Sequence, residues 1–290
     1  MMCSVCLYAA DMMQLPRYSR KEWAIVQCPQ CRFVFLENPP EYSALEETFD
    51  WEKTFHEERE RRKREEPMFF ALSSLWKRFR LRYFKHDKFY ALTQKFAVEG
   101  NILDIGCGTG PVLGEIASHL QEESQRRVYP FGIEVSKTLA ALAEERFASM
   151  GGAVIQNNAI EGLREFEEEF FSAVFMISFL EHERNPRQLL HETMRVLRPG
   201  GHILIKVPNF ACWNRQFRQE RWCGFRFPEH VNYFTPETLG QLTTESGFEV
   251  ARMHWSDKMP TNDNMYMVMR KADHPDKKTC PHTNESMHNT

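Results

Sequence analysis

The chain has 290 residues, of which 42% are hydrophobic and 27% are charged, and its formal net charge is -3. This composition predicts one large domain with a sizeable core and a small additional unit, and the near-neutral charge gives no general reason to expect nucleic-acid binding. No run of about 18 apolar residues is present, and the first residues lack the basic and then apolar order of a signal peptide. The sequence therefore predicts a cytoplasmic protein without an integral membrane segment.

Four of the eight cysteines form two Cys-x-x-Cys pairs near the N-terminus, Cys3 with Cys6 and Cys28 with Cys31. Two residues between paired thiolates let both sulfurs reach one tetrahedral ion, and a hairpin-length insert can bring the second pair opposite the first. A segment of roughly 35 residues is also too small to hold a core without such a staple. We therefore predict a structural zinc ion in a zinc ribbon over residues 1–40. The alternative is four reduced thiols or a redox pair.

The next segment, residues 41–99, is expected to be a helical connector or cap. Residues 51–98 hold 13 Lys and Arg against seven Asp and Glu, and apolar residues recur at helical spacing from Leu72 to Tyr90. A basic amphipathic helix over 69–96 could face an anionic substrate, RNA phosphates or a membrane surface. The simpler interpretation is a helix that covers a ligand cleft with its charges in water, and we favour it.

A short apolar run at 101–105 stops at three glycines, Gly106, Gly108 and Gly110, which predicts a buried strand followed by a ligand-binding turn. Glycine tolerates positive φ and has no Cβ, so the backbone can press against a ligand at a helix N-terminus. Pro111 stands where a dinucleotide fingerprint needs its third glycine, and no Gly-Lys-Ser/Thr follows for a P-loop. Both phosphate-binding interpretations are therefore weak.

Strands and helices alternate beyond this loop. A helix is expected over 112–120, a strand over 128–135 that contains Glu134, a helix over 136–150 and a strand over 153–156. The apolar run 172–178 predicts a strand covered on both faces, followed by a helix up to Arg198, a Pro-Gly-Gly turn and a strand over 202–207. Thr235 is expected to cap a helix that Gly247 ends, and strands over 248–255 and 265–270 close the domain.

These motifs resemble a known family when they are taken together. Asp104-Ile-Gly-Cys-Gly-Thr-Gly110, Leu180-Glu-His182, Arg195-Val-Leu-Arg-Pro-Gly-Gly201 and the segment around Phe234-Thr-Pro-Glu resemble class I S-adenosylmethionine-dependent methyltransferases of the quinone and sugar type. The resemblance covers residues 100–271, and the last residues, 272–290, read as a disordered tail. It implies an α/β fold with a doubly wound, Rossmann-like, seven-stranded and mostly parallel sheet.

The resemblance also implies a cofactor site for S-adenosylmethionine. Its residues are Asp104, Gly106, Cys107, Gly108, Gly110, Glu134, Asn158 and Ala159. Glu134 stands where a doubly wound domain places an acid on the ribose hydroxyls. Asn158 offers an amide oxygen where the family commonly has an aspartate for the adenine amino group.

An acceptor site is expected where the fourth strand of the domain ends. Glu181 and His182 follow that strand, and the aromatic insertion 209–233 supplies Trp222, His230 and Tyr233. His182 and His230 are the candidate catalytic bases, because an imidazole takes a proton near neutral pH. Either histidine could instead be a pocket wall or a structural, hydrogen-bonded residue.

The stretch from Cys28 to Pro40 resembles the zinc-ribbon module that precedes the methyltransferase domain in many bacterial sugar-type enzymes. We therefore predict an enzyme that methylates a small molecule, with a sugar or nucleotide-sugar acceptor favoured. One alternative is an RNA methyltransferase whose zinc ribbon and basic helix grip phosphates. Another is a zinc-binding module with an inactive methyltransferase domain. The Asn/Asp-Pro-Pro-Tyr motif of amino-group methylation does not follow the fourth strand.

Overall fold

The computed structural model describes residues 1–20, 22–39, 60, 63–64, 67, 75, 88–96, 99–122 and 125–273. Most of the predicted connector 41–99, the predicted basic helix before residue 88 and the tail from residue 274 lie outside the described residues.

The larger sheet contains β4 (Gly100–Ile105), β5 (Val128–Glu134), β6 (Ala153–Gln156), β7 (Phe171–Ile177), β8 (Leu197–Pro208), β10 (Glu249–Arg252) and β11 (Asn264–Arg270). The smaller sheet contains β1 (Met13–Gln14), β2 (Ile25–Gln27), β3 (Val34–Leu36) and β9 (Asn232–Tyr233). The helices are α4 (Lys88–Phe96), α5 (Pro111–Glu122), α6 (Lys137–Ala148), α7 (Ala159–Arg164), α8 (Pro186–Val196), α9 (Trp213–Arg218), α10 (Pro236–Glu245) and α11 (Trp255–Lys258), with a 3-10 turn η1 (Gln219–Arg221).

The seven-stranded sheet has the order β10-β11-β8-β7-β4-β5-β6. Strands β4 to β8 run parallel, whereas β11 is antiparallel to both of its neighbours. The chain builds β5 and β6 on one side of β4 and then returns to add β7 and β8 on the other side. The predicted doubly wound, mostly parallel sheet is confirmed, and its winding reverses between β4 and β7, which is where such sheets bind ligands.

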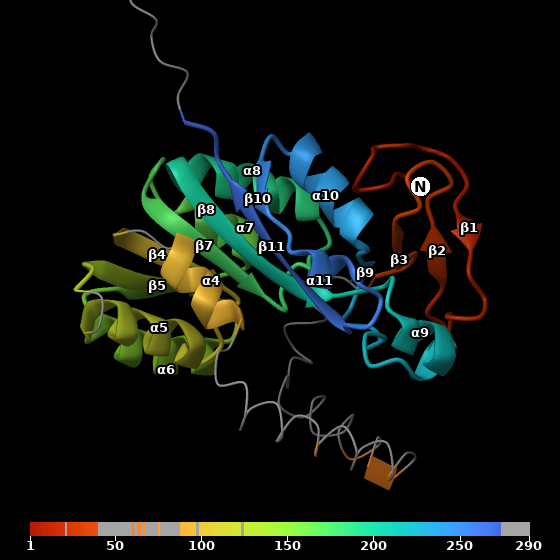
Figure 1. Ribbon diagram of the computed structural model, residues 1–290, viewed down its shortest axis with the longest axis horizontal. Helices are drawn as coiled ribbons and strands as arrows, with labels where there is room; N and C mark the ends of the chain where they lie inside the picture. The colour runs from red at the N-terminus through yellow and green to blue at the C-terminus, as the bar shows by residue number, and fades with distance from the viewer. Residues whose placement is uncertain are drawn as a thin grey trace, which may run out of the picture.

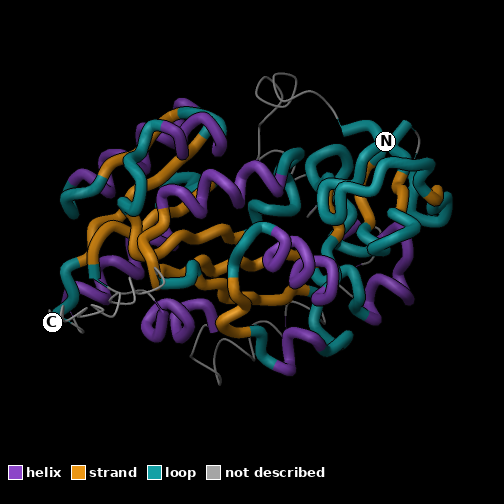
Figure 2. The backbone as a smooth tube through the Cα atoms, turned by 90° about the horizontal axis from the view of Figure 1, so that it is seen from above, coloured by secondary structure: helices purple, strands orange, loops and turns teal. Residues whose placement is uncertain are grey.

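Helices cover both faces of this sheet, because its strands are apolar on both sides (Figures 1 and 2). Leu103 and Ile105 of β4 pack with residues of α7, α8 and α10, whereas Ile102 faces α4, α5 and α6. The same alternation recurs in β7, where Met176 faces the first layer and Phe175 the second. Side chains of a strand point alternately to opposite faces, so each strand contributes to two cores.

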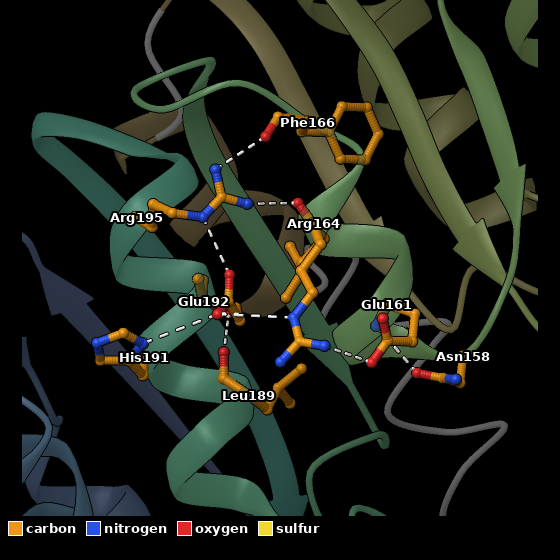
Figure 3. Close-up of polar contacts among 10 residues, drawn as sticks. Asn158, Glu161, Arg164, Phe166, Leu189, His191, Glu192 and Arg195 are labelled. Atoms are coloured by element: carbon orange, nitrogen blue, oxygen red, sulfur yellow. Dashed lines mark hydrogen bonds and ion pairs between the residues drawn. The ribbon is translucent and has the colours of Figure 1, made fainter.

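A polar network joins α7 to α8 on one face of the sheet (Figure 3). Arg195 donates to the carbonyl oxygens of Leu163 and Phe166 at 2.8 and 2.9 Å and forms an ion pair with Glu192 at 3.0 Å. Arg198, three residues later, donates to Glu169 O at 3.1 Å. Both arginines of the Arg-Val-Leu-Arg-Pro-Gly-Gly motif therefore fasten the connection between α7 and β7, which is a structural role.

Two expected boundaries differ from the structure by more than two residues. Strand β8 begins at Leu197, five residues before the expected start, because the Pro-Gly-Gly segment is part of the strand. Strand β10 ends at Arg252 after a register shift, and Trp255 begins the short helix α11 instead of ending a strand. The side chain of His254 caps α11 by accepting from Ser256 N, which explains the early change of direction.

The N-terminal residues 1–39 form an N-terminal unit, which packs against the segment 209–234 at the end of the larger sheet (Figure 1). Strand β9 pairs antiparallel with β3, with Val34 opposite Tyr233 and Phe35 opposite Asn232. Arg215 stacks its guanidinium over Phe210, 4.2 Å from the ring centroid, and donates to Tyr18 OH. The smaller sheet is therefore completed by a strand that comes from about 200 residues later in the chain.

Arg187 of α8 makes a second connection between the N-terminal unit and the large sheet. Its guanidinium donates to the carbonyl oxygens of Ser4 and Val5 and forms an ion pair with Glu245 of α10 at 2.6 Å. Cys3, Val5, Cys28 and Phe33 belong to the same buried cluster as residues of α8 and α10. The N-terminal unit is thus docked through both polar and apolar contacts.

Candidate active site

The glycine loop after β4 has the backbone that its sequence requires. Gly106, Gly108 and Gly110 have φ values of +74°, +56° and +71°, a region that residues with a Cβ rarely adopt. A Cβ at Gly106 would overlap Phe179 and one at Gly110 would overlap Phe147, whereas a Cβ at Gly108 would meet nothing within 4 Å. The loop is therefore packed at its two outer glycines and open at the middle one, where a ligand can approach.

Glu134, at the end of β5, fastens this loop. Its carboxylate accepts from Gly108 N and from Ser136 N, both at 2.9 Å, and its side chain is buried. Asp104, at the carboxyl end of β4, is 6% exposed. Burial, with the neighbouring charge of Glu134, raises the pKa of Asp104 to about 7. A positively charged ligand at this loop would therefore stabilise the ionised form of Asp104.

Asn158 and Ala159 begin α7 on the far side of β5. Asn158 is the N-cap of this helix, and its amide oxygen accepts from Glu161 N at 3.0 Å. The amide oxygen expected to bind the adenine amino group therefore already accepts one hydrogen bond. It can accept a second one through its other lone pair, and the amide nitrogen can donate. Ala159 is 3% exposed and packs in the core. Cys107 is likewise buried, below the glycine loop.

The loop that follows β7 leads into the expected acceptor site through Ser178, which has a φ of +55°. Left-handed backbone at a residue with a Cβ is uncommon and often marks functional sites. This turn directs Phe179 against Gly106, and it places Glu181 and His182 on the opposite side of the loop, beside the segment 229–232. The glycine loop and the loop after β7 therefore share one edge of the sheet.

The loop before β9 is held against this segment by backbone hydrogen bonds. Val231 N and Asn232 N both donate to Glu181 O, at 2.8 and 3.0 Å. The amide group of Asn232 donates to the carbonyl oxygens of Leu180 and Glu183, at 3.0 and 2.6 Å. Asn232 is 5% exposed, and no sequence pattern singled it out. It fixes the loop after β7 to the loop before β9.

The structure brings Glu181, His182 and His230 together, as predicted from two separate motifs. One ligand-type atom of each lies within 4.8 Å of the others, and the two imidazole rings are 4.6 Å apart between centroids. Burial and the charge of Arg226 lower the pKa of His182 to about 4, and burial also lowers that of His230. Burial raises the pKa of Glu181 to about 8, against the charges of Lys206 and Arg226. Both imidazoles are therefore neutral at pH 7.

Trp222 and Tyr233 occupy a different position from the expected one. Both are at most 2% exposed and lie inside the aromatic cluster between the N-terminal unit and the insertion. Trp222 Nε1 donates to Asp263 at 3.2 Å, and Tyr233 OH donates to His230 O at 2.8 Å. Tyr233 therefore fastens the backbone of His230, and Trp222 fastens the insertion to Asp263. Their aromatic character predicted a pocket, but the same character also predicts a core, and sequence alone does not separate the two.

The four N-terminal cysteines have the arrangement that a tetrahedral metal site needs. Their sulfurs all lie within 4.8 Å of one another, and the Cys3–Cys31 and Cys6–Cys28 pairs are 3.6 Å apart. Four sulfurs at 2.3 Å from a zinc ion would be separated by about 3.8 Å. Each Cys-x-x-Cys pair forms a knuckle, in which the sulfur of the first cysteine accepts two backbone hydrogen bonds. The donors are the N–H of the second cysteine and the N–H of the residue before it. The residues present thus fit a structural Zn²⁺ ion.

Fold, glycine loop and paired carboxyl groups together define a class I S-adenosylmethionine-dependent methyltransferase fold. A family model described as a methyltransferase domain matches residues 73–252, which is more than half of the chain. The chain therefore belongs to this methyltransferase family.

Two curated relatives and one solved structure illustrate the family. The ubiquinone biosynthesis O-methyltransferase of Alkalilimnicola ehrlichii is 30% identical over 109 residues, which cover 37% of this chain and 41% of that protein. The sterol 4-C-methyltransferase of Caenorhabditis elegans is 25% identical over 182 residues, 60% of this chain and 50% of that protein. The chain thus spans half or less of the length of these relatives. A S-adenosylmethionine-dependent methyltransferase structure from Methanosarcina mazei is 22% identical and covers 63% of this chain and 97% of that one, with a TM-score of 0.49.

Among the described residues, no helix combines the length and the apolar character needed to cross a bilayer.

Proposed function

We propose that this protein transfers the methyl group of S-adenosylmethionine to a small-molecule acceptor, a sugar or nucleotide-sugar. The observation that carries the proposal is the shared sheet edge: the open glycine loop after β4 and the Glu181, His182 and His230 cluster after β7 flank the point where the winding of the sheet reverses. The sugar class follows from the resemblance of the N-terminal ribbon to that of sugar-type enzymes.

In this proposal, the cofactor lies with its methionine end over the glycine loop. Asp104 faces the charged methionine portion of the cofactor. Glu134 accepts from the ribose hydroxyls through the carboxylate lone pairs that are not bonded to Gly108 N or Ser136 N. Asn158 and Ala159 flank the adenine. The methyl group would then point from β4 towards β7, and transfer requires the acceptor atom in line with it at about 3 Å.

The acceptor would lie against Glu181, His182 and His230, with the two histidines activating its oxygen. Both rings are neutral, and each donates its Nδ1–H to a backbone carbonyl oxygen, Glu229 O or Gly224 O, at 3.0 and 2.8 Å. Each ring therefore holds its lone pair on Nε2. We propose that Trp222 and Tyr233 act indirectly, by holding the loop that carries His230.

We further propose that Cys3, Cys6, Cys28 and Cys31 hold a structural zinc ion. The metal would fix the knuckles that precede β3, and β3 pairs with β9 directly beside His230. In this arrangement the ribbon is part of the wall of the acceptor site, and its metal stabilises that wall without taking part in the reaction.

A donor-labelled screen of acceptors tests the proposed function. Full-length protein would be incubated with methyl-labelled S-adenosylmethionine and with nucleotide-sugars, quinone precursors or RNA in parallel. The expected result is acceptor-dependent transfer to a nucleotide-sugar that His230→Ala lowers by about a hundredfold or more and His191→Ala, on the exposed face of α8, leaves unchanged. Transfer to RNA alone would overturn the small-molecule assignment. The absence of cofactor binding in calorimetry would overturn the methyltransferase activity itself.

A further inference from the structure

The cluster of Glu181, His182 and His230 has features that proton transfer alone does not explain. One oxygen and two nitrogens from two distant segments lie within 4.8 Å of one another. Glu181 is 1% exposed, and among the residues that the structure describes its Oε2 atom has no hydrogen-bond partner. Burying a carboxyl oxygen without a hydrogen-bond partner costs free energy on folding. A ligand that binds to this oxygen would recover part of that free energy.

The tautomers of the two histidines also favour a bound ligand at this cluster. A carbonyl oxygen only accepts, so His182 Nδ1 donates to Glu229 O and His230 Nδ1 donates to Gly224 O. The lone pair of each neutral ring is therefore on Nε2. Histidines that bind metals almost always donate their other N–H to a carbonyl or carboxylate oxygen, which fixes the ring and its tautomer. Both rings already have this second partner.

We propose that Glu181, His182 and His230 bind one divalent transition-metal ion. Two imidazole nitrogens and one carboxylate oxygen form a ligand set that catalytic metal sites use, with the remaining positions open to a substrate oxygen. Metal–nitrogen distances near 2.1 Å would place the ligands about 3.4 Å apart, so binding would draw the three side chains slightly together.

The charges around the cluster select the kind of metal. The positive charges of Lys206 and Arg226 both interact electrostatically with Glu181, and that of Arg226 also interacts with the two histidines. Hard cations such as Mg²⁺ and Ca²⁺ depend on several negative oxygens, and this site supplies one carboxylate beside two positive side chains. Metals that prefer imidazole nitrogen, such as Zn²⁺, Co²⁺, Ni²⁺ or Fe²⁺, fit better.

The catalytic part of this inference rests on the proposed function. A bound ion would polarise the acceptor oxygen and lower its pKa, so that the histidines act on the acceptor through the metal. The metal site itself does not depend on the reaction. Its test therefore reads metal content and coordination, and its failure is distinguishable from failure of the acceptor screen.

The experiment is a titration of the untagged 290-residue chain, with Zn²⁺ already bound at the cysteine cluster, with Co²⁺, and Mg²⁺ is the comparison. The expected result is saturable binding of one Co²⁺ per chain with the visible spectrum of nitrogen and oxygen ligands, and no comparable binding of Mg²⁺. Glu181→Gln and His230→Asn should each weaken Co²⁺ binding by at least about tenfold. The matched controls Glu237→Gln and His191→Asn lie at exposed positions and should bind as the wild type does.

Co²⁺ bound at the cysteine cluster is recognised by its sulfur ligands, so its signal is separable from that of a site with nitrogen and oxygen ligands. If a variant fails to fold, X-ray absorption of the Co²⁺-loaded wild type still decides, because the proposal requires two imidazole ligands. Sulfur-only coordination in that measurement, or Co²⁺ affinity unchanged in both Glu181→Gln and His230→Asn, would overturn the proposal.

Discussion

The proposed cofactor side and the proposed acceptor side of this protein are built in different ways. The cofactor side consists of consecutive strand, loop and helix segments from β4 to α7, and Glu134 ties the end of β5 directly to Gly108. The acceptor side combines segments that are far apart in the chain: the N-terminal unit, the loop after β7 and the insertion that ends in β9. The cofactor side is therefore stabilised by local structure, whereas the acceptor side depends on long-range docking.

The largest expected effect comes from removing a metal ligand of the N-terminal unit. Cys28→Ser should unfold the knuckles, release β3 from β9 and reduce methyl transfer below detection, because metal binding contributes directly to the folding of such segments. The affinity for S-adenosylmethionine should stay within about twofold of that of the wild type. Activity assays and calorimetry on the same preparation check both expectations. Loss of cofactor binding together with activity would mean that the two sides fold as one unit.

The next effect concerns the acceptor side alone. His230→Ala should lower turnover by about a hundredfold or more while sparing cofactor affinity, because the imidazole acts on the acceptor and not on the cofactor. His191→Ala is the matched control, since that side chain is 81% exposed on α8. Equal turnover in the two variants would remove His230 from the site.

On the cofactor side, Glu134→Gln should weaken S-adenosylmethionine binding by about 1.5 to 3 kcal/mol, or about 10- to 150-fold. The substitution removes the negative charge of the carboxylate. That carboxylate accepts from Gly108 N and Ser136 N and, in the proposal, from the ribose hydroxyls. Glu145→Gln, on the exposed side of α6, provides the control in calorimetric titrations. An affinity equal to that of the control would contradict the position proposed for the ribose.

Asp104 should give the cofactor side a pH dependence. Burial, and then the charge of Glu134, raises its pKa to about 7, so the ligand-free protein binds an extra proton between about pH 4 and pH 7. Its contribution to the free energy of unfolding is therefore complete below about pH 4 and is lost as the pH rises through about 7.

Cofactor affinity should change in the opposite sense, because the ionised carboxylate pairs with the positive cofactor. It should rise between pH 6 and pH 7.5, by up to about tenfold per pH unit. Calorimetry across this range checks the slope, and Asp104→Asn should flatten it. The same slope in the variant would assign the effect to another group.

The smallest expected effect tests the docking of the N-terminal unit. Arg187→Met removes the hydrogen bonds to Ser4 and Val5 and the ion pair with Glu245, and it should destabilise the protein by about 1 to 3 kcal/mol. Arg17→Met, at an exposed position of the same unit, is the control in thermal unfolding. A loss no larger than that of the control would show that apolar contacts alone hold the N-terminal unit.

The same contrast explains what the sequence could predict. The N-cap residues Ser136 and Thr235 act within a few residues of their partners, and the glycine loop and Glu134 end two successive strands, so their spacing in the sequence indicates their positions. The pairing of β3 with β9 involves two residues of each strand and has no local pattern.

Side chains with long-range roles were also outside the reach of sequence patterns. Asn232 and Arg187 form their hydrogen bonds with partners that lie about 50 to 180 residues away in the chain. Trp222 is equally aromatic in a pocket or in a core, and its burial is set by the packing of the N-terminal residues against the insertion. The sequence placed His182 at the end of β7 and His230 in the insertion expected to cover it, and the two rings lie 4.6 Å apart between centroids.

The central claim is that the N-terminal unit holds the acceptor loops in place, and amide hydrogen exchange with and without a zinc chelator tests it most directly. Residues 229–233 and 180–183 should lose protection along with residues 1–39 when the metal is removed, because the hydrogen bonds from Val231 N and Asn232 N to Glu181 O adjoin the pairing of β9 with β3. Residues 100–110 should keep their protection. Loss of protection confined to residues 1–39 would contradict the claim.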